Sequence, residues 1–148
     1  MRAIFSLALL LVSTFAFAQL EPVKWSFEVE KLNDKEYDII FSADIDRGWS
    51  LYSQFMEAQN GPIPTSFEFY RDGQIELVGD ASETGLRQES FDEIFGMKLV
   101  KYKSKARFVQ RVKVENGAEL ITGHLTYMTC DDNSCLPPED VNFEIALR

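Results

Sequence analysis

Residues 37–45 read Y-D-I-I-F-S-A-D-I and contain the clearest structural pattern in the chain. Apolar and polar side chains alternate along this stretch, the apolar positions being Tyr37, Ile39, Phe41, Ala43 and Ile45 and the polar ones Asp38, Ser42 and Asp44. A period of two is typical of a half-buried β-strand, because successive side chains point to opposite faces of a sheet. The stretch therefore predicts a strand with one face in a hydrophobic core.

Similar patterns recur on both sides of this strand. We expect further strands at residues 24–32, 49–52, 65–70, 74–78, 99–102, 106–114, 120–129 and 141–147. Turn formers such as Asn33-Asp34, Asp72-Gly73 and Asn116-Gly117 separate several of them. Residues 79–85 are polar and predict a loop, and residues 89–97 fit neither a helical nor a strand period. Short strands at regular spacing predict an all-β sandwich in one domain.

The N-terminus has the pattern of a secretory signal peptide. Arg2 precedes an apolar run at residues 3–17, and the run ends in Ala16-Phe17-Ala18. A basic start, a short apolar centre and an A-x-A ending are typical of such peptides, and the run is shorter than the about 20 apolar residues that span a membrane. We expect cleavage after Ala18, which leaves residues 19–148 as a secreted domain without membrane insertion.

The chain is strongly acidic. It carries 24 Asp and Glu residues against 15 Lys and Arg residues, for a formal net charge of -9 over 148 residues. A protein that binds nucleic acid is expected to present a basic patch, so this balance argues against a nucleic-acid partner and against anionic membrane surfaces. The length suits a single domain with a core of its own. We expect a monomer.

The only two cysteines, Cys130 and Cys135, lie in the stretch Y-M-T-C-D-D-N-S-C-L-P-P at residues 127–138. The four residues between them are turn formers, so a tight bend can bring the sulfurs together. Pro137 and Pro138 follow and make the chain leave the turn extended and stiff. In an oxidising compartment two such cysteines tend to pair.

A disulfide in this turn is compatible with either a structural or a reactive role. Closing a loop of about six residues removes only about 2 kcal/mol of denatured-state entropy, against about 4.7 kcal/mol for a hundred-residue loop. A bond that adds so little stability is better placed for exchange chemistry. Asp131 and Asp132 lie between the sulfurs, and their negative charge should raise the thiol pKa because it disfavours the thiolate.

Two other roles for the cysteines have weaker support. His124 precedes Cys130 by six residues, about 20 Å along an extended strand, which is too far for a direct hydrogen bond in a Cys–His nucleophile pair. A soft ion such as Cu(I) would suit Cys130, Cys135, Met128 and His124, although two cysteines without a second ligand pair make a weak zinc site. We predict neither a metal nor a cofactor.

Three segments together resemble a known family. The cysteine stretch, D-E-I-F-G at residues 92–96 and G-W-S-L-Y at residues 48–52 are similar to the N-terminal periplasmic domain of the thiol:disulfide interchange protein DsbD. The resemblance covers nearly the whole chain after the signal peptide. It implies an immunoglobulin-like β-sandwich in the periplasm. The cysteine pair of such a domain passes electrons between partner proteins, which are thioredoxin-like oxidoreductases or a membrane electron donor. Cytochrome c assembly is one process that uses such electron transfer.

The resemblance also implies roles for individual residues. Cys135 matches the cysteine that forms the mixed disulfide with partners, and Cys130 matches the one that resolves it. The family's cap loop, which shields the sulfurs until a partner displaces it, corresponds to Asp92, Glu93, Ile94, Phe95 and Gly96. Tyr52 matches an aromatic position close to the active site, with Trp49 nearby. Spacing alone leaves open whether Phe91, Ile94 and Phe95 form a lid or a loop tucked into the core.

The chain departs from the family pattern in three respects. Its cysteine loop is shorter than that of the family member compared, its cap carries Ile94-Phe95 where an aromatic pair is expected, and no transmembrane or thioredoxin-like domain follows. We therefore expect a separate protein to supply the electrons. Our prediction is an enzyme of the thiol:disulfide interchange type. The alternative is a non-catalytic envelope binding or assembly domain with a local structural disulfide.

Overall fold

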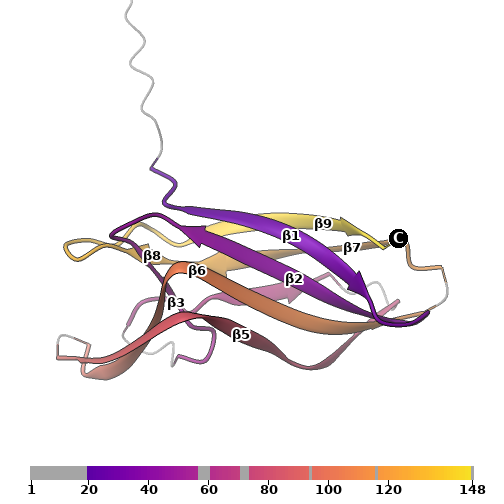
Figure 1. Ribbon diagram of the computed structural model, residues 1–148, viewed down its shortest axis with the longest axis horizontal. Helices are drawn as coiled ribbons and strands as arrows, with labels where there is room; N and C mark the ends of the chain where they lie inside the picture. Colours follow the sequence, from indigo (N-terminus) through magenta and orange to yellow (C-terminus); the bar gives the residue numbers. More distant parts are fainter. Residues whose placement is uncertain (1–19, 57–60, 71–73, 94, 116, 148) are drawn as a thin grey trace, which may run out of the picture.

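A computed structural model describes residues 20–147 apart from 57–60, 71–73, 94 and 116, and shows two β-sheets packed face to face (Figure 1). The larger sheet has the order β1-β2-β6-β3-β8, with strands β1 (Val23–Lys31), β2 (Glu36–Ile45), β6 (Met97–Val114), β3 (Ser50–Tyr52) and β8 (Thr129–Cys130). Strand β5 (Ile75–Asp92) also pairs with β6. The smaller sheet has the order β4-β7-β9, with strands β4 (Ser66–Phe69), β7 (Leu120–Tyr127) and β9 (Glu139–Ala146).

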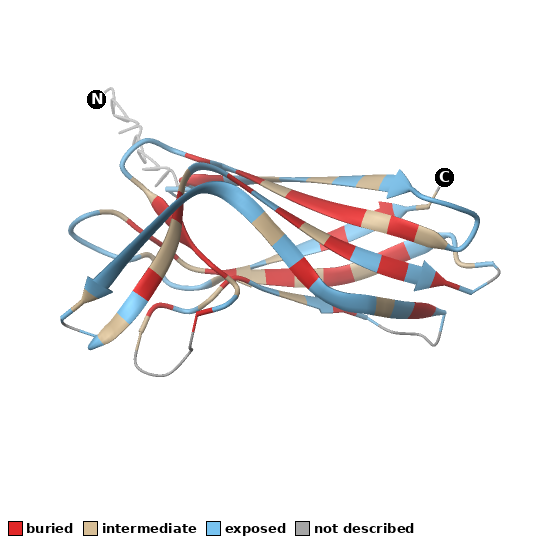
Figure 2. Cartoon of the chain, turned by 60° about the horizontal axis from the view of Figure 1, so that its bottom comes forward, coloured by how far each residue is buried: buried red, intermediate tan, exposed pale blue. Residues whose placement is uncertain are grey.

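The all-β prediction is confirmed, and the two-sheet arrangement is that of an immunoglobulin-like sandwich. Buried and exposed positions alternate along the strands, as Figure 2 shows, and the pattern is regular in β7 and in most of β2. The described part of the chain contains no helix that is long and apolar enough to cross a membrane.

Phenylalanine rings fill the space between the sheets. Phe41 of β2 is fully buried, and its ring centroid lies 4.5 Å from that of Phe67, 6.1 Å from that of Phe69 and 5.0 Å from that of Phe143. Phe67 in turn contacts Phe108 of β6 at 5.2 Å. These rings come from both sheets, so the alternation read from residues 37–45 does point one face of β2 into the shared core.

Strands β5 and β6 differ from the predictions. The predicted loop at residues 79–85 is wrong, because β5 stays paired with β6 from Ile75 to Asp92, with register shifts after Val78 and Gly85. An edge strand is held by backbone hydrogen bonds and needs no alternating apolar face, which explains why the pattern missed it. The predicted strands at 99–102 and 106–114 are one strand, β6, which contains Ser104 in a left-handed conformation with φ of 63°.

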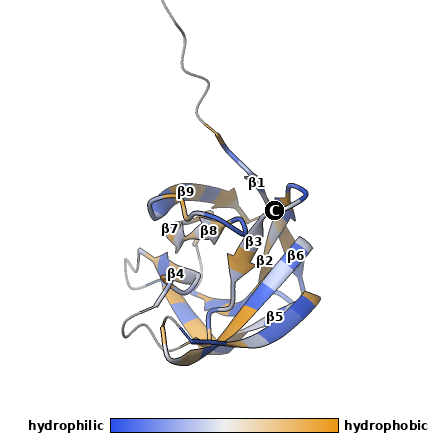
Figure 3. Ribbon diagram, turned by 90° about the vertical axis from the view of Figure 1, so that its left-hand side faces the viewer, coloured by the Kyte–Doolittle hydropathy of each residue, from blue (hydrophilic) through white to orange (hydrophobic). Residues whose placement is uncertain are grey.

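The chain changes sheets just before the cysteines. The predicted strand at residues 120–129 is divided at Met128, since Tyr127 ends β7 in the smaller sheet and Thr129 begins β8 in the larger one. This switch places the cysteine turn at the end of the sandwich where the β5–β6 hairpin also ends (Figure 1). Figure 3 looks at this end of the molecule, with β8 between β7 and β3.

Candidate functional site

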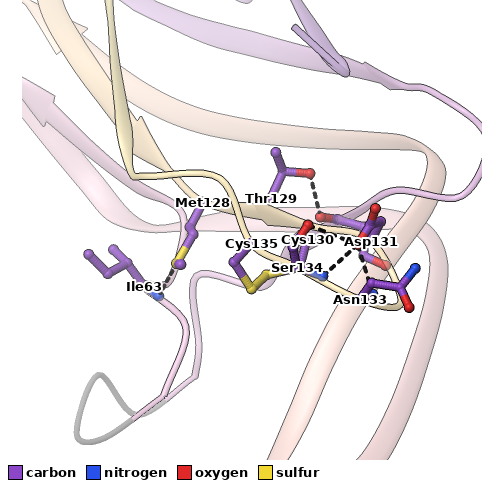
Figure 4. The surroundings of a disulfide bond; sticks show 9 residues. Ile63, Met128, Thr129, Cys130, Asp131, Asn133, Ser134 and Cys135 are labelled. Carbon is purple, nitrogen blue, oxygen red and sulfur yellow. Dashed lines mark hydrogen bonds between the residues drawn. A yellow bond between two sulfur atoms is a disulfide. The ribbon is translucent and has the colours of Figure 1, made fainter. Parts of the chain in front are cut away.

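Cys130 and Cys135 form a disulfide across a small hairpin (Figure 4). The two residues face each other as an antiparallel bridge with Cα atoms 4.0 Å apart. Two backbone hydrogen bonds flank the pair, one from Asp131 to Ser134 at 2.9 Å and one from Leu136 to Thr129 at 3.0 Å. This is the non-hydrogen-bonded type of antiparallel pair, in which opposite side chains lie closest. The backbone therefore closes the turn independently of the sulfurs.

The two cysteines differ sharply in accessibility. Cys130 is 4% exposed, because it pairs with buried Ser50 of β3 and belongs to a small cluster with Tyr52, Met56 and Leu99. Cys135 lies beyond the turn and is exposed. Thiol–disulfide exchange needs a thiolate to reach one sulfur of the bond. A nucleophile from outside can therefore reach Cys135 without opening the sandwich, whereas Cys130 is covered.

Asp131 organises the turn between the cysteines. Its Oδ1 accepts hydrogen bonds from the Asn133 amide at 2.8 Å, the Ser134 amide at 2.6 Å and the Ser134 hydroxyl at 3.3 Å (Figure 4). These donors, the Asn133 amide first, lower the pKa of the Asp131 carboxyl below its ordinary value. The neighbouring Asp132 is exposed and takes no part in this network. The two aspartates therefore differ in role although they are adjacent in sequence.

Ile63 and Met128 lie beside the disulfide, as Figure 4 shows. The Ile63 amide donates to Sδ of Met128 at 3.4 Å, and the Ile63 side chain is exposed while Met128 is half-buried. Ile63 was not singled out from the sequence, because no local pattern links it to the cysteines. The apolar side chain of Met128 thus lies between Ile63 and the disulfide in this view.

The structure brings Tyr52 and the start of the predicted cap loop together. Tyr52 packs in the Cys130 cluster, where burial first and then the Asp92 carboxylate raise the pKa of its phenol. Asp92 ends β5, and its Oδ1 accepts a hydrogen bond from the Phe95 amide at 3.1 Å. Gly96 follows with φ of 63°, a conformation that favours glycine. Residues 92–96, the predicted cap loop, thus connect β5 to β6, and the charge of Asp92 is close enough to Tyr52 to act on its phenol.

The side chains of Phe91 and Phe95 are not tucked into the core. Phe91 is 68% exposed and Phe95 is 37% exposed. Glu93 is also exposed, and Ile94 lies outside the described residues. Of the two possibilities that spacing left open, burial of Phe91 and Phe95 in the core is therefore excluded.

Two other residues named from the sequence are not members of the Cys130 cluster, although Trp49 directly precedes Ser50, which pairs with Cys130. Trp49 is half-buried and packs against the main core between the sheets. His124 is on β7, where Nδ1 lies 3.0 Å from the hydroxyl of Tyr70 and Nε2 lies 3.8 Å from a carboxylate oxygen of Glu68. Its imidazole therefore has partners on the smaller sheet, consistent with the long separation from Cys130 expected along the strand.

A polar cluster that the sequence reasoning missed anchors the segment after β3. Glu83 of β5 accepts hydrogen bonds from the Ser53 hydroxyl and from the Gln54 amide, the latter at 3.0 Å. Burial first, and then a hydrogen bond with Glu83, raise the pKa of Tyr102 to about 12. Ser53 directly follows Tyr52, so the cluster fixes the chain next to the Cys130 cluster. Glu83 was missed because it falls in the stretch predicted to be a loop.

Comparison with known proteins agrees with this geometry. The family model for the N-terminal domain of thiol:disulfide interchange protein DsbD matches residues 17–147. The chain belongs to the DsbD N-terminal family. A search of curated proteins found no match. The resemblance drawn from the cysteine stretch, the cap segment and the G-W-S-L-Y segment is therefore confirmed at the level of the family.

Solved structures support the same fold. The N-terminal periplasmic domain of ScsB from Proteus mirabilis is 14% identical, with a TM-score of 0.61 over 88% of this chain and 48% of that chain. The DsbD N-terminal domain of Neisseria meningitidis, solved in a complex with the PilB N-terminal domain, is 21% identical, with a TM-score of 0.51 over 84% of this chain and 87% of that chain. The chain thus spans about half the length of the ScsB domain.

Proposed function

We propose that this protein exchanges dithiol and disulfide with partner proteins through the Cys130–Cys135 pair. The observation that carries the proposal is the unequal exposure of the two cysteines, since Cys130 is buried and Cys135 is exposed within one disulfide. Membership of the DsbD N-terminal family supports thiol:disulfide exchange as the class of chemistry. A purely structural bond would not need one sulfur presented at the surface.

Reduction of the pair begins at the exposed sulfur. A donor thiolate attacks Sγ of Cys135, so that a mixed disulfide forms, the Cys130–Cys135 bond breaks and Cys130 leaves as a thiolate. A second donor thiol then attacks the donor sulfur of the mixed disulfide and releases Cys135. Two electrons and two protons pass to the pair, and the donor becomes oxidised.

Oxidation of the pair runs through the same atoms in reverse. The Cys135 thiolate attacks the disulfide of an acceptor protein and forms a mixed disulfide, with release of one acceptor thiol. Cys130 then attacks Sγ of Cys135, which re-forms the internal disulfide and releases the second acceptor thiol. In this scheme Cys135 makes the contact with partners and Cys130 resolves it.

The proposed partners are thioredoxin-like oxidoreductases, with another such protein or a membrane component as electron donor. The Neisseria DsbD domain was solved in a complex with another protein domain, which supports partner docking in this family. Exposed Ile63 and half-buried Met128 offer apolar surface in the surroundings of the disulfide, which suits such docking. We place the protein in the periplasm as a monomer of residues 19–148, after removal of the signal peptide at Ala18.

We further propose that residues 92–96 act as a cap that moves when a partner docks. Asp92 lies near Tyr52 of the Cys130 cluster, and Phe91 and Phe95 at this hairpin have exposed rings. The Phe95 amide donates a hydrogen bond to Asp92 within the tip of this hairpin, and neither residue belongs to the main core, so a partner could displace the tip without opening the sandwich.

Trapping of mixed disulfides tests the assignment. A Cys130→Ser variant keeps the exposed Cys135 thiol but loses the resolving thiol. Incubated with a thioredoxin-fold oxidoreductase that keeps a single active-site cysteine, activated as its mixed disulfide with thionitrobenzoate, it should release thionitrobenzoate and accumulate a covalent adduct, detected by intact mass and reversed by dithiothreitol. A Cys135→Ser variant is the matched control and should give little adduct, because Cys130 is covered. Equal trapping by both variants, or none by either, would contradict the proposal.

A further inference from the structure

The turn that carries the cysteines is held by contacts that involve no sulfur. Oδ1 of Asp131 accepts three hydrogen bonds, from the amide of Asn133 and from the amide and hydroxyl of Ser134. Two backbone hydrogen bonds across the hairpin flank the cysteine pair as well. Reduction of the disulfide removes none of these donors or acceptors. The reduced turn can therefore keep the shape of the oxidised one.

The two cysteines depend on this turn to different degrees. Cys130 is fixed by β8, which pairs with β3 through Ser50, and the Thr129 hydroxyl adds a hydrogen bond of 2.8 Å to the Ser50 carbonyl. Cys135 lies outside any strand, between the turn at residues 131–134 on one side and Leu136, whose amide donates to the Thr129 carbonyl, on the other. A loosened turn would therefore leave Cys130 in place but hold Cys135 from the Leu136 side alone, so that the position of Cys135 relative to Cys130 becomes less fixed.

We propose that Asp131 is a positioning residue for the exchange reaction, which holds Cys135 within reach of Cys130 while a mixed disulfide is open. The inference rests on the proposed function above. It concerns one step: the Cys130 thiolate attacks Sγ of Cys135, the internal disulfide forms, and the partner sulfur leaves as a thiolate with the electron pair. Fixing both reacting groups gives such an intramolecular step a high effective concentration, which a loose turn would lower.

The first attack should not depend on Asp131 in this way. Cys135 is exposed and meets its substrate from solution, so it needs no particular position relative to Cys130. A purely structural role of Asp131 would not separate the two steps. The specific signature is a slowed second step with a nearly unchanged first step.

Asp132 provides a matched control. Like Asp131 it lies between the sulfurs, but it is exposed and outside the hydrogen-bond network of the turn. Asp131→Ala and Asp132→Ala each remove one negative charge from the loop, so both alter the electrostatics of the thiols. Only Asp131→Ala removes the acceptor that closes the turn. Asp131→Asn keeps an acceptor oxygen and tests whether that oxygen is sufficient.

The experiment mixes the reduced full-length protein with 5,5′-dithiobis(2-nitrobenzoate) in a stopped-flow instrument. Attack by Cys135 releases one coloured thiolate, and closure by Cys130 releases a second. Losing the hydrogen bonds of Asp131 should slow the second release about tenfold relative to Asp132→Ala, with the first release within about twofold. In Asp131→Asn, the rate of the second release should return most of the way to that of the unsubstituted protein. A second measurement equilibrates each protein with reduced and oxidised glutathione. The equilibrium constant for forming the internal disulfide should be about tenfold lower in Asp131→Ala than in Asp132→Ala.

The outcomes separate the inference from the proposed function. If Asp131→Ala and Asp132→Ala slow the second release equally, charge alone matters and the positioning role is wrong. An unchanged second release in Asp131→Ala also overturns it. If the unsubstituted protein never gives a second release, the pair does not close on a mixed disulfide, and the proposed function fails together with the inference.

Discussion

The main core and the small cluster around Cys130 are both buried and apolar, yet they are built from different side chains. Interlocked phenylalanine rings from both sheets form the centre of the main core, whereas the small cluster combines Tyr52, Met56 and Leu99 with half of the disulfide. Packed rings are costly to remove, while methionine is flexible and adapts to changed neighbours. The comparison indicates that the stability of the fold and the chemistry of the cysteines reside in separate parts of the molecule.

The largest effect is expected in the main core. Phe41→Ala removes a fully buried ring that contacts rings on β4 and β9. It should lower the free energy of unfolding by about 3–5 kcal/mol, through lost burial and the cavity left behind. Denaturant titration followed by tryptophan fluorescence measures the loss. A decrease below about 1 kcal/mol would show that the rings do not form the stabilising core.

Replacing both cysteines should have a smaller effect on stability. The Cys130→Ser, Cys135→Ser double variant loses a bond that closes only a short loop, so the free energy of unfolding should fall by about 2 kcal/mol or less. The backbone hydrogen bonds of the hairpin remain. The variant should fold, keep its circular dichroism spectrum and lose all exchange activity. An unfolded double variant would assign the disulfide a structural role and remove the separation between the two regions.

The smallest effect is expected from protonation of Asp131. Its pKa is lowered by hydrogen bonds from the Asn133 amide and then from Ser134, so the folded state binds the proton less tightly than the unfolded state. The stabilisation is therefore complete above the ordinary pKa of 3.8 and is lost as the pH falls through the lowered value. The difference in unfolding free energy between the unsubstituted protein and Asp131→Ala should be constant near neutrality and shrink below about pH 4.

Asp132→Ala serves as the control for the loss of one negative charge in the acid titration. The free energy of unfolding of all three proteins is measured in urea between about pH 7 and pH 2. A gap between the unsubstituted protein and Asp131→Ala that persists unchanged to the lowest pH would show that the ionised carboxylate does not stabilise the turn.

Local patterns were sufficient for most of the sandwich. The alternation at residues 37–45 identified β2 and its buried face, because one side of that strand lies against the other sheet. It identified only the start of β5, at residues 75–78, and failed from residue 79 onward, where the strand is held at a sheet edge by its backbone and is largely exposed. It also missed the sheet switch at Met128, since a strand that moves from one sheet to another keeps an extended backbone throughout.

The site was predictable only in part for a similar reason. The cysteines, the turn formers between them and Tyr52 could be named from the sequence, and the structure places Tyr52 in the Cys130 cluster. Ile63 and Glu83 could not be named, because their contacts with Met128 and Ser53 depend on segments far apart in the chain. The unequal exposure of the cysteines likewise follows from the pairing of β8 with β3, which no local pattern reveals.

The reduction potential of the Cys130–Cys135 pair is the most direct test of the exchange role. The protein is equilibrated in graded thiol buffers, and its alkylated cysteines are counted by intact mass. A disulfide that exchanges with partners should have a potential of about -180 to -270 mV, within the range of exchange proteins. A value below about -300 mV would mark a structural bond and contradict the proposed function.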